Sequence, residues 1–272
     1  MGLSLPLDYF NQSQLNEYLM CGHKYKLKYI DGHRSSNLSM IRGTAVHHAA
    51  ASRHIRMKLE GEESTEEEVA AWAADRYDEE TSNEENIYLN EEEKKANKEK
   101  VIGATKDTTI DLALTFAREI APRIKTPIIV EETIEFCHPS GLVLKGTLDL
   151  VHKDDEDCIS LADLKTASRR KNQVDADISR QLTFYSLLYL SRYKTRPDVV
   201  ELQVLVANKK PTAQFLRSTR VEYDIKSLLK TIEFVVKNIS AGVFGPASDF
   251  AWWCTPKQCE LWHRCKFTGG SK

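Results

Sequence analysis

The 272-residue sequence has no long hydrophobic run and no basic N-terminal region followed by an apolar stretch. A membrane-spanning helix needs roughly 18 consecutive apolar residues, and a secretory signal needs the second pattern. We therefore expect an intracellular, cytoplasmic chain without a membrane segment. Internal repeats and long flexible linkers are also absent. Their absence favours one α/β domain spanning residues 1–272.

Cysteine is scarce, and its distribution is uneven. The first half of the chain contains only Cys21, whereas Cys254, Cys259 and Cys265 crowd the last 20 residues. Paired disulfides are rare inside cells, where thiols are kept reduced. Clustered cysteines in such a chain therefore favour metal coordination over disulfide bonding.

The formal net charge is only −2, but this small value hides a strong asymmetry. Residues 60–93 carry 15 acidic side chains and one basic side chain, and the rest of the chain has a net charge of +12. The acidic run is typical of a solvated helical surface, so we expect a partly acidic helical insertion over 60–122. The basic remainder can attract a polyanion.

Apolar periodicity and turn residues predict an alternation of helices and strands. The expected helices are 13–19 (capped by Ser13), 23–30, 43–59, 62–80, 91–122, 176–192 and 224–241, and the expected strands are 127–136, 142–151, 158–165, 199–206 and 214–223. Short polar turns join the first three strands, which predicts an antiparallel meander. Cys137 and Cys158 fall in these strands, where we expect them to be buried as small hydrophobic residues.

Two acidic residues and a lysine in the middle strands indicate chemistry. Asp163 and Lys165 are two residues apart, so a strand presents both on one face. If the preceding strand pairs with theirs, Asp149 stands beside Asp163. Two converging carboxylates suit Mg²⁺ or Mn²⁺, and such an ion can activate water for attack on a phosphodiester. The Asp-x-Lys pattern alone is uninformative, since Asp224-Ile-Lys226 also matches it, but only the first follows an Asp-bearing strand.

Four short motifs occur in a fixed order: RGTAVHH (42–48), GTLDLV (146–151), LADLKT (161–166) and QLTFY (181–185). In this order and rough spacing, they resemble the RecB-like exonuclease branch of the PD-(D/E)XK nuclease superfamily, which includes CRISPR-associated and phage nucleases. The resemblance implies a restriction-endonuclease-like core, in which helices flank a mixed central sheet.

The same resemblance assigns roles to individual residues. The implied metal ligands are His47, Asp149, Asp163 and the backbone carbonyl of Leu164; the implied catalytic residues are Asp149, Asp163 and Lys165; the implied substrate-binding residues are Gln181 and Tyr185. The alternative for the last pair is a polar packing contact. A glutamate on the preceding strand is also typical of the family, and both Glu131 and Glu132 qualify. The basic run 169–171 suits either a phosphate contact or a solvated loop.

One subset of the branch holds a [4Fe–4S] cluster that clamps the two ends of the domain. Here the resemblance implies that Cys21 joins the C-terminal segment 246–272 through Cys254, Cys259 and Cys265. Their C-x4-C-x5-C spacing departs from the commoner C-x2-C-x5-C form. Four thiolates also suit Zn²⁺, which is therefore the alternative.

Together these features predict a metal-dependent DNA nuclease. The sequence has no evident base-reading module, and phosphate contacts carry no sequence information, so exonuclease action on DNA ends or single strands is favoured. The resemblance implies a role in DNA repair, recombination, phage replication or CRISPR adaptation. It also implies proteins of those processes as partners, and the host cytoplasm if the chain is phage-encoded. The competing hypothesis is a non-catalytic DNA-binding or scaffold subunit of a recombination complex that retains the fold.

Overall fold

The computed structural model describes residues 7–33, 36–82, 87–154 and 156–268. Five strands form one mixed sheet in the order β3-β4-β5-β6-β7: β3 (Thr126–Cys137), β4 (Val143–Lys153), β5 (Ile159–Ala167), β6 (Val199–Val206) and β7 (Thr212–Ser218). Neighbouring strands are antiparallel except β5 and β6, which are parallel. The predicted meander of three strands and the mixed sheet are confirmed.

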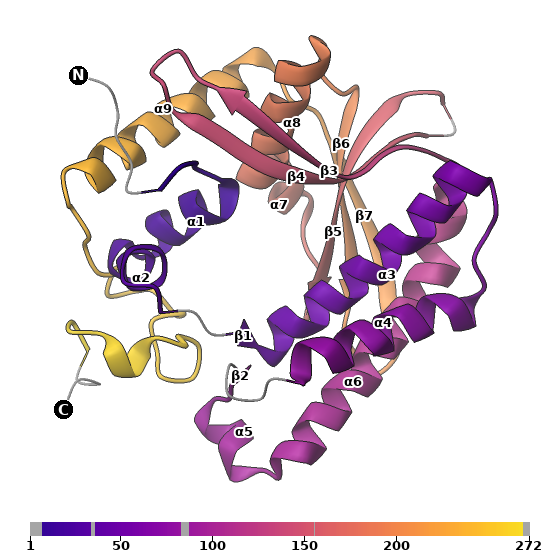
Figure 1. Ribbon diagram of the computed structural model, residues 1–272, viewed down its shortest axis with the longest axis horizontal. Coiled ribbons are helices and arrows are strands. Elements are labelled where there is room, and N and C mark those ends of the chain that lie inside the picture. Colours follow the sequence, from indigo (N-terminus) through magenta and orange to yellow (C-terminus); the bar gives the residue numbers. More distant parts are fainter. Residues whose placement is uncertain (1–6, 34–35, 83–86, 155, 269–272) are drawn as a thin grey trace.

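Helices cover both faces of this sheet (Figure 1). On one face lie α1 (Gln12–Met20), α8 (Arg180–Tyr193) and α9 (Glu222–Ser240), and on the other lie α3 (Leu38–Glu60), α4 (Glu66–Thr81) and α6 (Lys98–Thr115). The apolar stripe of α9 explains its position, because Ile225, Leu228 and Ile232 recur at helical spacing and are buried. The predicted α/β architecture with flanking helices is therefore correct. None of the described helices is both long and apolar enough to cross a bilayer.

The expected helix over 91–122 is divided in the structure. A short α5 (Glu91–Lys95) ends before Asn97, whose side chain accepts a hydrogen bond from the Lys100 amide and so begins α6. After Thr115 the chain continues in a π-helical and a 3₁₀ turn to Arg123. The cap at Asn97 starts a new helix here. Apolar periodicity does not reveal such a cap, because the cap depends on one polar side chain.

The acidic run is partly neutralised by basic side chains of neighbouring elements. Ion pairs join Arg56 to Glu68, Arg118 to Glu66 and Lys106 to Asp78 at 2.5–2.7 Å. The insertion is therefore held against α3 and within itself by paired charges rather than being purely solvated. Residues 83–86 of the acidic run lie outside the described residues.

Further local predictions are wrong. Asn11, not Ser13, caps the first helix, because its side chain accepts from the Gln14 amide at 2.8 Å. The last strand ends at Ser218, and the chain is helical from Glu222, where Asp224 accepts from the Val221 amide. Cys137 is exposed at the end of β3.

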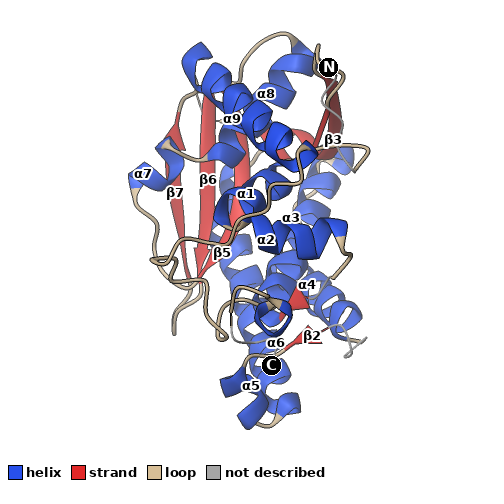
Figure 2. Cartoon of the chain, turned by 90° about the vertical axis from the view of Figure 1, so that its left-hand side faces the viewer, coloured by secondary structure: helices blue, strands red, loops and turns tan. Residues whose placement is uncertain are grey.

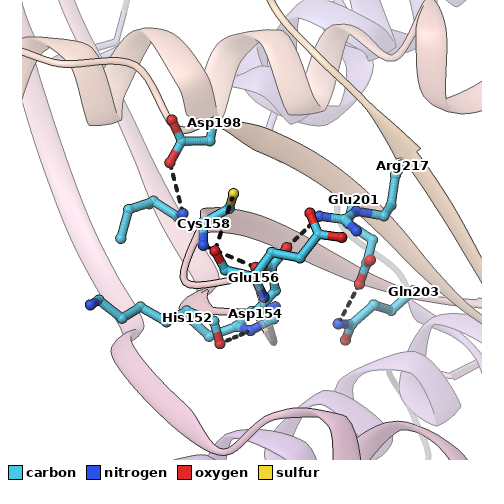
Figure 3. A network of polar contacts seen from close by, with 10 residues as sticks. His152, Asp154, Glu156, Cys158, Asp198, Glu201, Gln203 and Arg217 are labelled. Atoms are coloured by element: carbon cyan, nitrogen blue, oxygen red, sulfur yellow. Dashed lines mark hydrogen bonds and ion pairs between the residues drawn. The ribbon is translucent and has the colours of Figure 1, made fainter.

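Cys158 also differs from expectation, since it lies half-buried in the turn before β5 rather than in a strand core. Figure 3 shows the polar network that holds this turn. The Asp154 carboxylate accepts from the amides of Glu156 and Cys158 at 3.0 and 2.9 Å and also pairs with Arg217. Asp155 lies outside the described residues.

The C-terminal segment after α9 lies beside α1 and α2 (Gly22–Tyr25), as Figures 1 and 2 both show. The His23 amide donates to Gly245, and the Tyr18 hydroxyl donates to Val243, at 2.8 and 2.7 Å. On its other side the C-terminal segment contacts the insertion. There β2 (Ile87–Tyr88), parallel to β1 (Ser36–Asn37), offers the Tyr88 hydroxyl to the Pro256 carbonyl at 3.0 Å.

Gly146 permits α8 to pack closely on β4. A Cβ at this position would lie 2.8 Å from Cδ1 of the buried Leu188. We expect Gly146→Ala to lower the free energy of unfolding by about 1–3 kcal/mol because the core becomes overpacked. Urea unfolding measures the change, with Gly103→Ala in α6 as control. A Cβ there meets nothing within 4 Å, so the control gains up to about 1 kcal/mol. Unchanged stability of Gly146→Ala would show that Leu188 moves aside freely.

Candidate functional site

One helix and two strands bring three potential metal ligands together. His47 comes from α3, Glu131 from β3 and Asp149 from β4, and each offers a ligand atom within 4.8 Å of the other two. The His47 Nδ1 lies 3.4 Å from the Asp149 Oδ2. Nitrogen and carboxylate oxygen donors at such spacing can share one divalent ion.

An unusual backbone conformation carries Glu131 to this position. Its φ of 48° is left-handed, which is rare for a residue other than glycine and marks local strain. It stands where the β3–β4 pairing skips from Val130↔Leu150 to Glu132↔Leu148. The choice between the two glutamates is resolved by position: Glu131 lies in the site, whereas the Glu132 carboxylate accepts from the Tyr193 hydroxyl at 3.3 Å.

Asp163 on β5 adjoins this group and is fully buried. Its Oδ1 accepts from the Lys165 ammonium at 2.9 Å and from the Gln181 amide at 2.7 Å. Gln181 also donates to the Tyr185 hydroxyl at 2.9 Å, and Tyr185 is buried on α8. The Asp163 Oδ2 has no hydrogen-bond partner among the described residues. A buried carboxylate oxygen without a partner is costly, and a cation would satisfy it.

Asp163 lies beside, not within, the group of three. Only His47, Glu131 and Asp149 have ligand atoms all within 4.8 Å of one another among the described residues. The Asp149 Oδ2 accepts from the Leu164 amide at 3.2 Å, and the Leu164 backbone lies close enough to His47 to act on its pKa. These contacts place the Leu164 backbone beside both side chains.

Burial changes the pKa of each acid in the site. Burial and the charge of Asp149 raise the pKa of Asp163 to about 7, against the opposing effect of Lys165. Burial and Asp149 likewise raise the pKa of Glu131 to about 7, since its carboxylate faces the site although much of the side chain is exposed. The pKa of Asp149 is raised by burial as well. Crowded acids of this kind favour a bound cation.

The pKa shifts of His47 and Tyr185 also suit metal binding. Burial and the nearby Lys165 lower the pKa of His47, so its imidazole is neutral at neutral pH and can act as a ligand. Burial raises the pKa of Tyr185 and keeps its hydroxyl protonated. The site therefore combines a neutral imidazole, anionic oxygens and one ammonium group.

A lone histidine on an alanine-rich helix is more often a packed or surface residue, and His54 is packed. It is buried on α3 two turns after His47. Both histidines line one small cavity, together with Gln203. A spacing of seven residues on one helix places both histidines on one face, which is a signal that the sequence does contain. The basic residues Arg169, Arg170 and Lys171 are exposed on the loop after β5.

The four cysteines singled out in the sequence line a second cavity. Cys21, Cys254, Cys259 and Cys265 surround a space of about 110 Å³ together with Trp252, Trp253 and Trp262. Among the described residues, no three of these sulfur atoms lie within 4.8 Å of one another. Burial raises the pKa of Cys259 to about 11, and burial and the neighbouring thiols Cys21 and Cys265 raise the pKa of Cys254.

A buried ion-pair cluster supports this cavity. Lys24 lies 3.0 Å from Glu17 and 3.1 Å from Glu260, which joins α1 and α2 to the C-terminal segment. Burial alone would lower the pKa of Lys24, but the two glutamates outweigh it and raise that pKa. No sequence pattern indicated this triad, because Glu260 lies more than 200 residues from Glu17 and Lys24.

The sequence model of the PD-(D/E)XK nuclease superfamily matches residues 9–266. Among solved structures, the chain is similar to a "Putative exonuclease" from Eubacterium rectale with a TM-score of 0.51 and 7% identity, over 95% of this chain and 88% of that chain. A likeness to the protein SSO0001 covers 94% of this chain and 96% of that chain at 14% identity, but its TM-score of 0.36 is too low to bear on the fold. None of the curated proteins matches.

The family match spans nearly the whole chain, and the first structural likeness supports the same fold. The matched segment includes the acidic site, by which we mean His47, Glu131, Asp149 and the adjoining Asp163. It also includes all four cysteines of the second cavity. This protein therefore belongs to the PD-(D/E)XK nuclease superfamily.

Proposed function

We propose that this nuclease is a RecB-like exonuclease that hydrolyses phosphodiester bonds at DNA ends or in single strands with Mg²⁺ or Mn²⁺. The supporting observation is the convergence of His47, Glu131 and Asp149 beside the buried Asp163 and its partner Lys165. Hard oxygen donors favour Mg²⁺ or Mn²⁺ over softer metals. A role in repair, recombination, phage replication or CRISPR adaptation is part of this proposal and follows from the family branch.

Each residue of the site would have a separate role in such a reaction. His47, Glu131, Asp149, the Asp163 Oδ2 and the Leu164 carbonyl would hold the ion. When bound, it would polarise the phosphate and lower the pKa of water. Lys165, held by Asp163, presents an ammonium group that can orient the attacking water and offset charge on the phosphate. Gln181 fixes the orientation of the Asp163 carboxylate and of the Tyr185 hydroxyl.

The competing class is a scaffold that binds DNA without cutting it. Such a protein has no need for a buried carboxylate whose pKa is raised to about 7, because this arrangement costs folding stability. Strained backbone at Glu131 adds a further cost. Both costs are understandable if the residues hold a catalytic ion, so we favour the enzyme.

We further propose that the four cysteines hold a [4Fe–4S] cluster rather than Zn²⁺. Structural zinc usually takes closely spaced pairs of cysteines, whereas here the single Cys21 faces three cysteines of the C-terminal segment. A one-plus-three set of thiolates around one cavity suits the cluster better. The surrounding tryptophans can shield such a cluster from water.

Glu131→Gln tests the proposed enzyme, with the adjacent Glu132→Gln as its matched control. We expect Mn²⁺-dependent release of nucleotides from strands labelled at either end by the wild type and by the control. Glu131→Gln should lose activity by about a hundredfold or more, because a ligand is replaced by a weaker neutral donor. Time courses with Mn²⁺ and with EDTA measure the effect. Equal product from the two variants would refute the site, and a wild type that releases nothing would refute the nuclease.

A further inference from the structure

An open cleft of about 300 Å³ adjoins the acidic site and ends at Asp149. It lies between the start of α1 and strands β3 and β4, on the side of the sheet where Figure 1 shows α1 beneath β4. Its lining is mostly polar and includes Tyr9, Gln12, Ser13, Lys145, Thr147 and Asp149. None of the residues at its α1 end has a role in the site described above.

The start of α1 is held firmly at this cleft. Phe10 pairs with β4 in an isolated bridge. Its amide donates to the Val143 carbonyl at 2.8 Å, and its carbonyl accepts from the backbone amide of Lys145 at 3.0 Å. The side chain of Asn11 caps the amide of Gln14. The first two helical residues, Gln12 and Ser13, therefore present their amides at a fixed place on the cleft wall.

The donors at this helix start lack acceptors. Gln12 is 7% exposed, and its side-chain Nε2 has no hydrogen-bond partner among the described residues. The amides of Gln12 and Ser13 precede the first intrahelical acceptors, and no described residue accepts from them. A buried amide without a partner costs about 1–3 kcal/mol. A helix N-terminus with free donors favours an anion.

Lys145 adds a positive charge to the same cleft. It lies on the same face of β4 as Thr147 and Asp149, and four strand residues place it about 13 Å from Asp149. Its ammonium lies 2.7 Å from Glu135 and 5.2 Å from the ring of Tyr9. The Glu135 carboxylate is largely exposed, and exposed pairs contribute little. Lys145 can therefore turn to a stronger anion.

We propose that the first turn of α1 and Lys145 bind a non-scissile phosphate of the substrate strand, a few nucleotides from the bond that is cut at the acidic site. This inference rests on the proposed nuclease function. The row from Lys145 through Thr147 to Asp149 then guides the sugar–phosphate backbone into the site. Contacts of this kind position a strand without reading its bases, in keeping with cutting that ignores sequence.

Binding measurements test the subsite directly. The variants are Gln12→Met, which keeps the side-chain volume but removes the donor, and Lys145→Gln. The control is Lys226→Gln, which removes a lysine paired with Glu222 on α9, away from the cleft. Fluorescence anisotropy with a labelled 12-nucleotide single strand, in EDTA at several salt concentrations, gives the affinities. We expect about tenfold weaker binding for both variants, a salt slope smaller by about one for Lys145→Gln, and no change for the control.

Neutral phosphates locate the contact along the strand. Each phosphate in turn is replaced by an uncharged methylphosphonate, and Mn²⁺-dependent cleavage is measured. For the wild type, we expect one non-scissile position where the replacement raises KM about tenfold, and we expect the double variant Gln12→Met/Lys145→Gln to lose that sensitivity. If the wild type cuts but shows no such position, or the double variant keeps it, the subsite is refuted while the nuclease stands. A wild type that neither binds nor cuts refutes both.

Discussion

Asp163→Asn is expected to abolish cleavage while making the metal-free protein more stable at pH 8. Activity should fall about 10³-fold or more, because residues that act together around one ion cannot replace each other. Stability should rise by about 1–3 kcal/mol, because asparagine has the same shape without the buried charge. Few substitutions change activity and stability in opposite directions so strongly.

The sign follows from the pKa of Asp163. In the folded protein this pKa is about 7, above its ordinary value of 3.8, because burial outweighs the attraction of Lys165. The folded state therefore binds the proton more tightly than the unfolded state does. Ionisation destabilises the metal-free fold by up to about 4 kcal/mol above pH 7, and this penalty disappears as the pH falls toward 4. The advantage of Asp163→Asn should disappear over the same range.

Urea unfolding in EDTA at pH 8 and pH 5, and then with Mn²⁺ at pH 8, measures these effects. Mn²⁺ should stabilise the wild type and have little effect on Asp163→Asn. Asp224→Asn is the control, since it alters the Asp-x-Lys sequence at the start of α9. We expect it to keep full activity. A loss of stability in Asp163→Asn at pH 8 in EDTA would show that the hydrogen bonds to Lys165 and Gln181 outweigh the cost of burial.

Cys21→Ser is expected to remove the proposed cluster and most of the stability that it supplies. A group that joins Cys21 to Cys254 closes a loop of more than 200 residues, and closure of that size is worth about 5 kcal/mol on the disulfide analogy. A whole domain is stable by only about 5–15 kcal/mol. The Cys21 sulfur accepts a hydrogen bond from the Lys24 amide at 3.3 Å, and a serine hydroxyl can still accept it. The loss therefore reports on the cluster rather than on the helix start.

Anaerobic purification, iron and sulfide analysis and chemical unfolding test this expectation. The wild type should be brown and contain iron, and Cys21→Ser should contain little iron and unfold at a lower denaturant concentration. The exposed Cys137→Ser serves as control and should match the wild type. A colourless wild type that contains zinc would replace the iron–sulfur proposal with the zinc alternative. A stable wild type without any metal would contradict both.

Much of the architecture was predictable from sequence because it depends on local patterns. Short polar turns between β-rich runs determined the meander β3-β4-β5, and the apolar stripe of α9 determined its buried face. The spacing of two in Asp163-Leu-Lys165 placed both side chains together, as their 2.9 Å contact shows. Boundaries that depend on capping were less predictable, as at Asn11 and Asn97, because one polar side chain decides them.

The sequence by itself determined the run of helices and strands, the antiparallel meander and the pairing of Asp163 with Lys165 on one face, since periodicity and spacing act over short distances. The mixed sheet with its flanking helices was implied by the family resemblance instead. Only the tertiary structure chose Glu131 over Glu132, because that choice depends on a left-handed residue within β3. Only the tertiary structure also brought Gln12 and Lys145 to one cleft and Lys24 to Glu260. Contacts between residues far apart in the chain form when elements pack, and no local pattern encodes them.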